Sequence, residues 1–202
     1  SYHQAHLPVR QQDEAFGHAV RAVYLYSGMA DIARITKDEE LYQACVRLWN
    51  NVTKKKMYIT GGIGATHLGE AFSFPYDLPN DTAYAETCAS IGLMFWARRM
   101  LEIVPDVKYA DIMERALYNH ILPSIHTSQP GAFTYFLSLE PGYFKTFSRP
   151  YDSHWCCVGT GMENHAKYGE FIYFHHEKEV YVNLFVASAL CWEKEGFQME
   201  TI

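Results

Sequence analysis

The chain has 202 residues, with 17 Lys and Arg against 23 Asp and Glu, and a net charge of −6 at pH 7. Hydrophobic residues make up 49% of it and aromatic residues 15%, so it can bury a core and is not disordered as a whole. The net negative charge argues against a nucleic-acid-binding protein, and no apolar run approaches the ~20 residues that a membrane-spanning helix needs.

The first quarter of the chain predicts a helical hairpin. Residues 13–35 form an amphipathic pattern with apolar side chains three and four positions apart, namely Phe16, Val20, Val23, Met29, Ile32 and Ile35. Residues 39–52 continue the pattern, and the short link Thr36–Asp38 makes the two helices antiparallel neighbours. Lys54–Asp81 then holds a strand-like MYIT and many glycines, prolines and aromatic residues, which indicates a long, ordered, functional loop.

The remaining chain alternates helices with irregular segments. Three more helices are expected, one from an N-cap at Asp81 or Thr82 to Pro105, one over 106–121 and one over 161–175. A second irregular stretch, 123–159, contains FTYFLSL as a possible strand, and Val180–Leu190 is typical of the start of a sheet. Helical hairpins joined by long loops favour an α/α toroid or solenoid whose loops build a site on one face. We expect the chain to be a piece of a longer enzyme.

Cysteine usage favours a reducing compartment, which we take to be the cytoplasm; the alternative is the periplasm, if a signal peptide precedes this segment in a longer protein. The chain has five cysteines, and two of them, Cys156 and Cys157, are adjacent. An odd number with an adjacent pair is a poor disulfide framework but can put two thiolates on one metal ion. The N-terminus lacks the basic and apolar regions of a signal peptide.

Three thiols and one carboxylate are candidate metal ligands. Glu86 and Cys88 open a helix after the first long loop, and Cys156-Cys157 ends the second. This donor set suits Zn²⁺, which takes four N, S or O ligands. Because positions i and i+2 point to nearly opposite sides of a helix, a shared metal would require Glu86 to lie outside a regular helix or at its first turn. The plainer alternative is buried cysteines and a Glu stabilised by the helix dipole.

Glu70 and His18 are candidates for different reasons. Glu70 lies among glycine and aromatic residues in GEAF, where desolvation would raise a carboxyl pKa and suit a general acid; the alternative is an exposed loop residue. His18, in GHAVR, is expected in mid-helix, where a lone His is more often packed and hydrogen-bonded than a ligand. The sequence contains no HExxH, P-loop or strand–GxGxxG–helix pattern, so nucleotide binding is not supported.

Three long motifs carry a resemblance to glycoside hydrolase family 127, whose type activity is β-L-arabinofuranosidase. They are GHAVRAVYLYSGMADIA, MYITGGIGATHLGEAFSFPYDLPNDTAYAETCASIGLMF and WCCVGTGMENHAKYGEFIYF. The last motif resembles the related family 146 more closely, since family 127 members often read CACCPPN there.

The resemblance implies a fold, a cofactor and roles for particular residues. The fold would be an (α/α)₆ barrel followed by β-sandwich domains, with residues 1–177 in the partial barrel and 178–202 at the start of a sandwich. Zn²⁺ would be held by Glu86, Cys88, Cys156 and Cys157. Cys156 would be the nucleophile of a retaining mechanism and Glu70 the acid/base, while His18 and Tyr135 would contact the sugar of an oligosaccharide or glycoside substrate. Because the family's other sugar contacts lie on helices absent here, we expect the fragment by itself to be inactive.

Two alternatives remain open from the residues. The first is a carboxylate-pair glycosidase in which Glu70 and Glu86 do the acid and base work and the cysteines are structural. The second is a non-catalytic helical scaffold that binds a sugar without turnover.

Overall fold

Helices dominate the structure, a computed structural model that describes residues 2–202, and this confirms the mainly helical prediction. The chain divides into one unit ending at Met162 and a second over Glu163–Ile202. The helices are α1 (Ala19–Thr36), α2 (Glu39–Lys55), α3 (Thr87–Ile103), α4 (Val107–Ala116), α5 (Cys156–Ala166) and α6 (Gly169–Ile172). The strands are β1 (Tyr173–His176), β2 (Glu179–Val182), β3 (Ser188–Trp192) and β4 (Phe197–Thr201).

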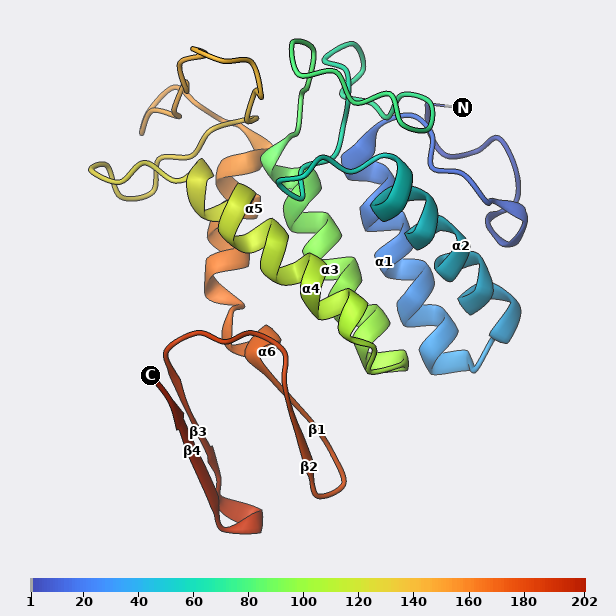
Figure 1. The fold of residues 1–202 in the computed structure, drawn as a ribbon, viewed down its shortest axis with the longest axis vertical. Coiled ribbons are helices and arrows are strands. Elements are labelled where there is room, and N and C mark those ends of the chain that lie inside the picture. Colours follow the sequence, from blue (N-terminus) through green and yellow to red (C-terminus); the bar gives the residue numbers. More distant parts are fainter. Residues whose placement is uncertain (1) are drawn as a thin grey trace. The chain divides into compact units, whose positions relative to one another are not determined.

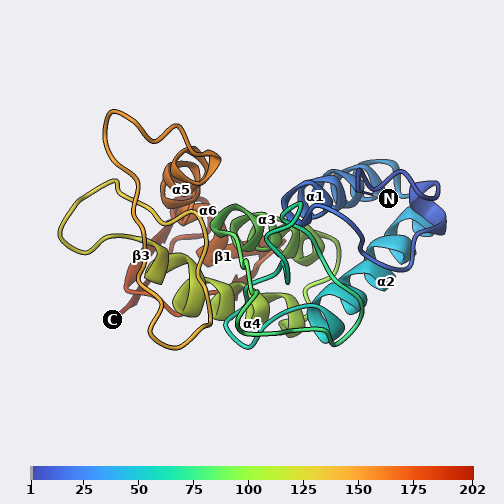
Figure 2. The same cartoon turned by 90° about the horizontal axis from the view of Figure 1, so that it is seen from above.

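Helices α1 to α4 lie side by side in the first unit and alternate in direction (Figures 1 and 2). Consequently α1 and α3 both begin at the same end of the group. The long loops that precede α3 and α5 also gather at this end, which we call the loop end (Figure 1). The toroid itself is a closed ring of such hairpins, and four helices with alternating direction are consistent with part of one.

Helix α3 forms the centre of the first unit, because 13 of its 17 residues are buried. It packs against both α1 and α4. Gly92 lets α1 approach closely, since a Cβ at this position would lie 2.6 Å from Val23 Cγ2. Trp96 contacts Trp49 of α2 and Tyr26 of α1, with 5.0 Å between ring centroids in each pair. This aromatic packing joins α1 and α2 to α3 and forms the core beneath the long loops.

Helix α1 begins at Ala19, six residues later than predicted, so His18 is its N-cap and not a mid-helix residue. Gly17 adopts φ +72°, and a Cβ there would lie 2.4 Å from the Tyr2 carbonyl oxygen. The close approach of the N-terminal segment therefore prevents the helix from starting earlier. Of the six apolar residues expected to face inward, Val23 and Met29 are buried, whereas three are exposed, namely Phe16, Ile32 and Ile35. A neighbouring stripe of α1, made of small and apolar side chains, is buried instead.

Helix α3 also begins later than predicted, after Glu86, because the preceding segment is tied to the first long loop. Tyr84 and Ala85 both donate their backbone N–H to the Gly64 carbonyl, at 3.1 and 3.0 Å. Neither expected strand forms a regular element in the described residues. The MYIT segment makes one isolated bridge, Met57 with Ile63, and FTYFLSL makes isolated bridges that include Glu86 with Phe136.

The second unit consists of α6 and two antiparallel hairpins, β1–β2 and β3–β4. The helix expected over 161–175 is divided into α5, α6 and the start of β1, and the expected sheet segment 180–190 is interrupted between β2 and β3. The β-sandwich, and the division of the chain at residue 177, stay predictions. No helix of residues 2–202 combines the length and apolar character needed to cross a membrane.

His120 lies beneath the loop end, in a π-helical turn (Leu117–Ile121) that continues α4. The side chain is buried, and among the described residues its Nε2 atom has no hydrogen-bond partner. Burial lowers the pKa of His120 to about 4, although a hydrogen bond with the backbone of Ala85 opposes the shift. The ring is therefore neutral in the folded protein at neutral pH.

We expect His120 to reduce stability at acidic pH. Because its pKa is about 4 when folded and near 6.5 when unfolded, the unfolded chain binds the proton more tightly, so stability is lost as pH falls from 6.5 toward 4. The loss should approach about 3 kcal/mol. Urea unfolding at pH 7 and pH 4.5 should show a smaller pH effect for His120→Gln than for the parent chain. The exposed His67→Gln serves as control, and an equal pH effect in both variants would contradict the assignment.

Candidate active site

Three helix N-termini meet at the loop end of the first unit, and each supplies a polar side chain to one site. His18 is the N-cap of α1, Glu86 is the N-cap of α3, and Cys156 is the first residue of α5. A helix N-terminus favours negative charge, because its first N–H groups point outward unpaired. The site is therefore built to accept carboxylates, thiolates or other anionic groups.

Cys88, Cys156, Cys157 and Glu86 form a compact cluster, in which one ligand atom of each lies within 4.8 Å of the others. The Sγ atoms of Cys88 and Cys157 are 3.2 Å apart, and those of Cys156 and Cys157 are 3.7 Å apart. Glu86 Oε1 lies 3.4 Å from Cys156 Sγ and 3.5 Å from Cys157 Sγ. The structure thus brings together the four residues that the sequence grouped, and it does so with Glu86 outside the helix, as a shared ion requires.

The pKa values of the thiols in this cluster shift in opposite directions. Hydrogen bonds from Cys157 and Cys88 lower the pKa of Cys156, whose side chain is the exposed one of the three. The hydrogen bond with Cys156 raises the pKa of Cys157 and of Cys88. Burial raises the pKa of Glu86 to about 9, and the charge on Cys156 adds to the shift. Within the cluster, Cys156 is therefore the thiol whose surroundings favour the thiolate.

The cluster fits a tetrahedral metal ion better than it fits any bond between its sulfurs. A disulfide needs ~2.05 Å between sulfurs, far less than the separations observed. A Zn–S length of ~2.3 Å implies roughly 3.7 Å between two sulfurs on one ion, and about 3.5 Å between a sulfur and a carboxylate oxygen. The second oxygen of Glu86 is buried, with no hydrogen-bond partner among the described residues. A cation would compensate this buried carboxylate, so the group can bind a metal ion.

Glu70 lies next to the cluster, on a loop that is fastened to the start of α1. Its carbonyl accepts the Ala19 N–H at 2.9 Å, and Phe72 N–H donates to the Gly17 carbonyl at 2.9 Å. Glu70 itself has φ +50°, a conformation that non-glycine residues rarely adopt and that clusters at functional sites. The backbone therefore holds this carboxylate in a fixed position, partly exposed, with 28% of its side chain accessible.

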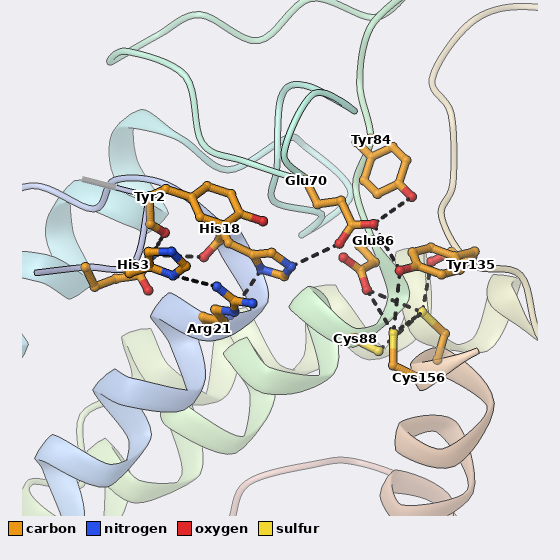
Figure 3. A network of polar contacts seen from close by, with 12 residues as sticks. Tyr2, His3, His18, Arg21, Glu70, Tyr84, Glu86, Cys88, Tyr135 and Cys156 are labelled. Carbon is orange, nitrogen blue, oxygen red and sulfur yellow. Dashed lines mark hydrogen bonds and ion pairs between the residues drawn. The ribbon is translucent and has the colours of Figure 1, made fainter. Parts of the chain in front are cut away.

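His18 orients the carboxylate of Glu70. Its Nδ1 accepts the Arg21 N–H at 3.4 Å, which leaves Nε2 as the nitrogen that carries the proton. Nε2 lies 3.0 Å from Glu70 Oε2. Figure 3 shows the ring of His18 directed at Glu70, with Tyr2, His3 and Arg21 behind it. Because α1 starts after His18, the histidine lies at the helix N-terminus and its ring faces Glu70.

Two tyrosines complete the surroundings of Glu70. The hydroxyls of Tyr84 and Tyr135 donate to Glu70 Oε1 at 3.3 and 3.0 Å, and the Tyr135 hydroxyl also lies 3.7 Å from Cys156 Sγ. Burial raises the pKa of both tyrosines, so both hydroxyls stay protonated. Tyr135 thus connects the carboxylate with the exposed thiol. Tyr135 was a candidate only through the family resemblance, and no pattern in the sequence marks Tyr84.

Comparison with known proteins shows what this chain is similar to. Residues 1–170 match the family model described as β-L-arabinofuranosidase, GH127 catalytic domain. A curated relative, non-reducing end β-L-arabinofuranosidase of Bifidobacterium longum subsp. longum, is 46% identical over 125 residues, which cover 62% of this chain. The match spans 19% of that protein.

Solved structures resemble the chain over nearly its whole length. A GH127 β-L-arabinofuranosidase from Geobacillus stearothermophilus T6 is 47% identical, with a TM-score of 0.82 over 94% of this chain. A GH127 β-arabinofuranosidase is 41% identical, with a TM-score of 0.89 over 98% of this chain. The chain spans 31% of the length of each.

We expect the cluster to bind one divalent ion per chain. Cys157→Ser should weaken Zn²⁺ binding at least tenfold, because it removes a buried thiolate ligand. Competition with a chromophoric chelator gives the affinity, and elemental analysis after dialysis gives the stoichiometry. Cys191→Ser changes an exposed cysteine outside the cluster and is the matched control. Equal zinc affinity in the two variants would show that the ion is held elsewhere.

Proposed function

This chain belongs to the GH127 β-L-arabinofuranosidase catalytic-domain family, and on that premise we propose that it forms part of a zinc-dependent, retaining glycoside hydrolase. The substrates would be β-L-arabinofuranosides or related plant glycans. The observation that carries the proposal is the placement of Glu70 and Cys156 on either side of one hydroxyl, that of Tyr135. A proton donor and a nucleophile are thereby close enough to act on the same glycosidic bond.

Glu86, Cys88, Cys156 and Cys157 would hold the zinc ion. When bound, zinc would supply positive charge that keeps the thiols deprotonated at neutral pH. Cys156 is the member of the set suited to attack a substrate, because it alone of the three is exposed and its pKa is the one that the cluster lowers. Cys88 and Cys157 are buried and would serve as ligands only.

The proposed reaction has two steps. In the first, the Cys156 sulfur forms a bond to the anomeric carbon while the bond to the leaving oxygen breaks, and Glu70 gives that oxygen its proton. In the second, Glu70 takes a proton from water, the water oxygen bonds to the anomeric carbon, and the carbon–sulfur bond breaks to restore the Cys156 thiolate. Two inversions give net retention.

His18 and the two tyrosines would prepare Glu70 for both roles. Nε2 of His18 and the hydroxyls of Tyr84 and Tyr135 hold the carboxylate from both oxygens, so it needs little reorganisation as the proton moves. His18 and Tyr135 also border the space between Glu70 and Cys156, where we place the arabinofuranosyl ring.

A reaction using Glu70 and Glu86 as the catalytic pair has less support. Their carboxylate oxygens lie within 4.8 Å of each other, a separation that would suit retention. Glu86, however, is only 2% exposed, and burial raises its pKa to about 9. Glu86 is enclosed by the thiols and cannot reach a substrate, whereas a cation bound there would keep it ionised, so Glu86 is better suited to the metal.

Cys156→Ser should abolish turnover. A serine hydroxyl is not ionised by this site, so the rate for an aryl β-L-arabinofuranoside should fall at least about a thousandfold. The assay uses a full-length enzyme that carries this segment, because the segment is 31% of its solved relatives. Cys191→Ser should keep the parent rate, and a Cys156→Ser enzyme with normal turnover would refute the thiolate mechanism in favour of the carboxylate pair.

Glu70→Gln should lose turnover in a way that depends on the leaving group. Gln cannot protonate the departing oxygen, so alkyl and sugar glycosides should suffer most. Glycosides of acidic phenols leave without a proton, and their loss should be at least about tenfold smaller. Steady-state rates across a series of aryl glycosides measure this dependence. An equal loss for every leaving group would assign Glu70 a role other than acid catalysis.

A further inference from the structure

We propose that His120 is a positioning residue for Glu86: its ring holds the backbone of Ala85 and thereby directs the carboxylate of the next residue to the thiol cluster. This inference rests on the proposed function, because it takes Glu86 to be a zinc ligand. His120 lies outside the site, on the π-helical turn (Leu117–Ile121) that continues α4 in the first unit. Short π-helical turns within α-helices are frequent at functional sites.

The backbone of Ala85 is strained and firmly held. Its φ angle is +32°, a region that L side chains rarely adopt, and the residue is buried. Its N–H donates to the Gly64 carbonyl at 3.0 Å, and its carbonyl accepts the Leu137 N–H at 3.2 Å. Strain of this kind persists only where the surrounding groups impose it. The contacts of Ala85 therefore determine the direction in which the chain enters α3.

His120 supplies a further contact to Ala85. Its buried ring forms a hydrogen bond with the Ala85 backbone, and because this bond raises the pKa of His120, the ring donates and the carbonyl accepts. Nε2 has no partner among the described residues, so Nδ1 is the donating atom. A Cβ on Gly62 would lie 3.0 Å from Nδ1 and 3.0 Å from the Ala85 Cβ. The glycine thus leaves the room in which the ring and Ala85 meet.

The direction of the Glu86 side chain follows from this backbone. Glu86 is the N-cap of α3 with extended backbone angles, φ −68° and ψ 138°, and its side chain makes no capping hydrogen bond to the helix. The carboxylate faces Cys156 and Cys157 instead, as Figure 3 shows for Cys156. A negative φ at Ala85 would change the entry of the chain into α3 and carry the Glu86 carboxylate away from the sulfurs.

Two unfavourable features therefore meet immediately before a metal ligand. One is the φ angle of Ala85, and the other is the buried Nε2 of His120, which has no hydrogen-bond partner in the described structure. A buried apolar side chain in place of His120 would avoid the second but could not hold the Ala85 carbonyl. Groups that orient a metal ligand from behind change metal affinity by about tenfold to a hundredfold when they are replaced.

Asn and Gln at this position separate positioning from packing. In His120→Asn the amide N–H lies where Nδ1 lies and can still donate to Ala85, whereas in His120→Gln it lies further out, in the place of Nε2. Gly62→Ala crowds Nδ1 and tests the same contact from the other side. Ile121, the next residue of the turn, is 1% exposed, and Ile121→Ala is the matched control that opens a cavity there.

The measurements use a full-length enzyme that carries this segment. Chelator competition at pH 7 gives the Zn²⁺ affinity, and circular dichroism establishes that each variant is folded. Loading with Co²⁺ adds a spectroscopic signature, because the thiolate-to-cobalt charge-transfer band reports the sulfur cluster and the ligand-field bands report the complete set of ligands.

His120→Gln and Gly62→Ala should each weaken Zn²⁺ binding on the order of tenfold. Their ligand-field bands should change while the thiolate band remains, because Glu86 is displaced and the three sulfurs are not. His120→Asn and Ile121→Ala should keep the parent affinity and spectrum. Parent-like binding in both weakened variants overturns the inference, and so does an equal loss in His120→Asn or Ile121→Ala, because His120 would then only pack. A parent enzyme without a thiolate band overturns the proposed zinc site, and the inference with it.

Discussion

The close packing of α1 against α3 is the contact on which the site depends. Gly92 has no side chain that would keep the two helices apart. Trp96 joins α3 to both helices of the α1–α2 hairpin. Since the two helices run in the same direction, their N-termini lie together and place His18 and Glu86 close to each other. A change in the α1–α3 distance would therefore separate His18 and Glu70 from the cluster of Glu86 and the three cysteines.

Repulsion among the acidic groups of the site explains why the loop that carries Glu70 is tied by backbone hydrogen bonds. Three thiols and two carboxylates within a few ångströms repel one another as they ionise, and burial adds to the free-energy cost. The Ala19 N–H donates to the Glu70 carbonyl and the Gly17 carbonyl accepts the Phe72 N–H, and these two bonds hold the backbone of Glu70 despite its unfavourable φ angle. A bound cation would relieve the repulsion in the sulfur cluster, so we expect metal binding and local stability to be coupled.

The two long loops divide the chemistry between them. The loop before α3 supplies Glu70 and Tyr84, and the loop before α5 supplies Tyr135 and leads directly into Cys156. Their only regular pairings are isolated bridges, such as Glu86 with Phe136, in the part of the chain that the structure describes. Residues of these loops can thus vary while the helices and the cluster of Glu86 and the cysteines stay unchanged.

The sequence by itself determined the helical class, the start of α2 and the grouping of Glu86 with the three cysteines, because these depend on local periodicity and on donor chemistry. The starts of α1 and α3 were decided by tertiary structure. Tyr2 crowds Gly17, and Gly64 captures Tyr84 and Ala85, so both helices begin several residues later than their periodicity indicates. That delay makes N-caps of His18 and Glu86 and creates the site. The contact of Tyr84 and Tyr135 with Glu70 likewise joins residues from different loops, which no local pattern can encode.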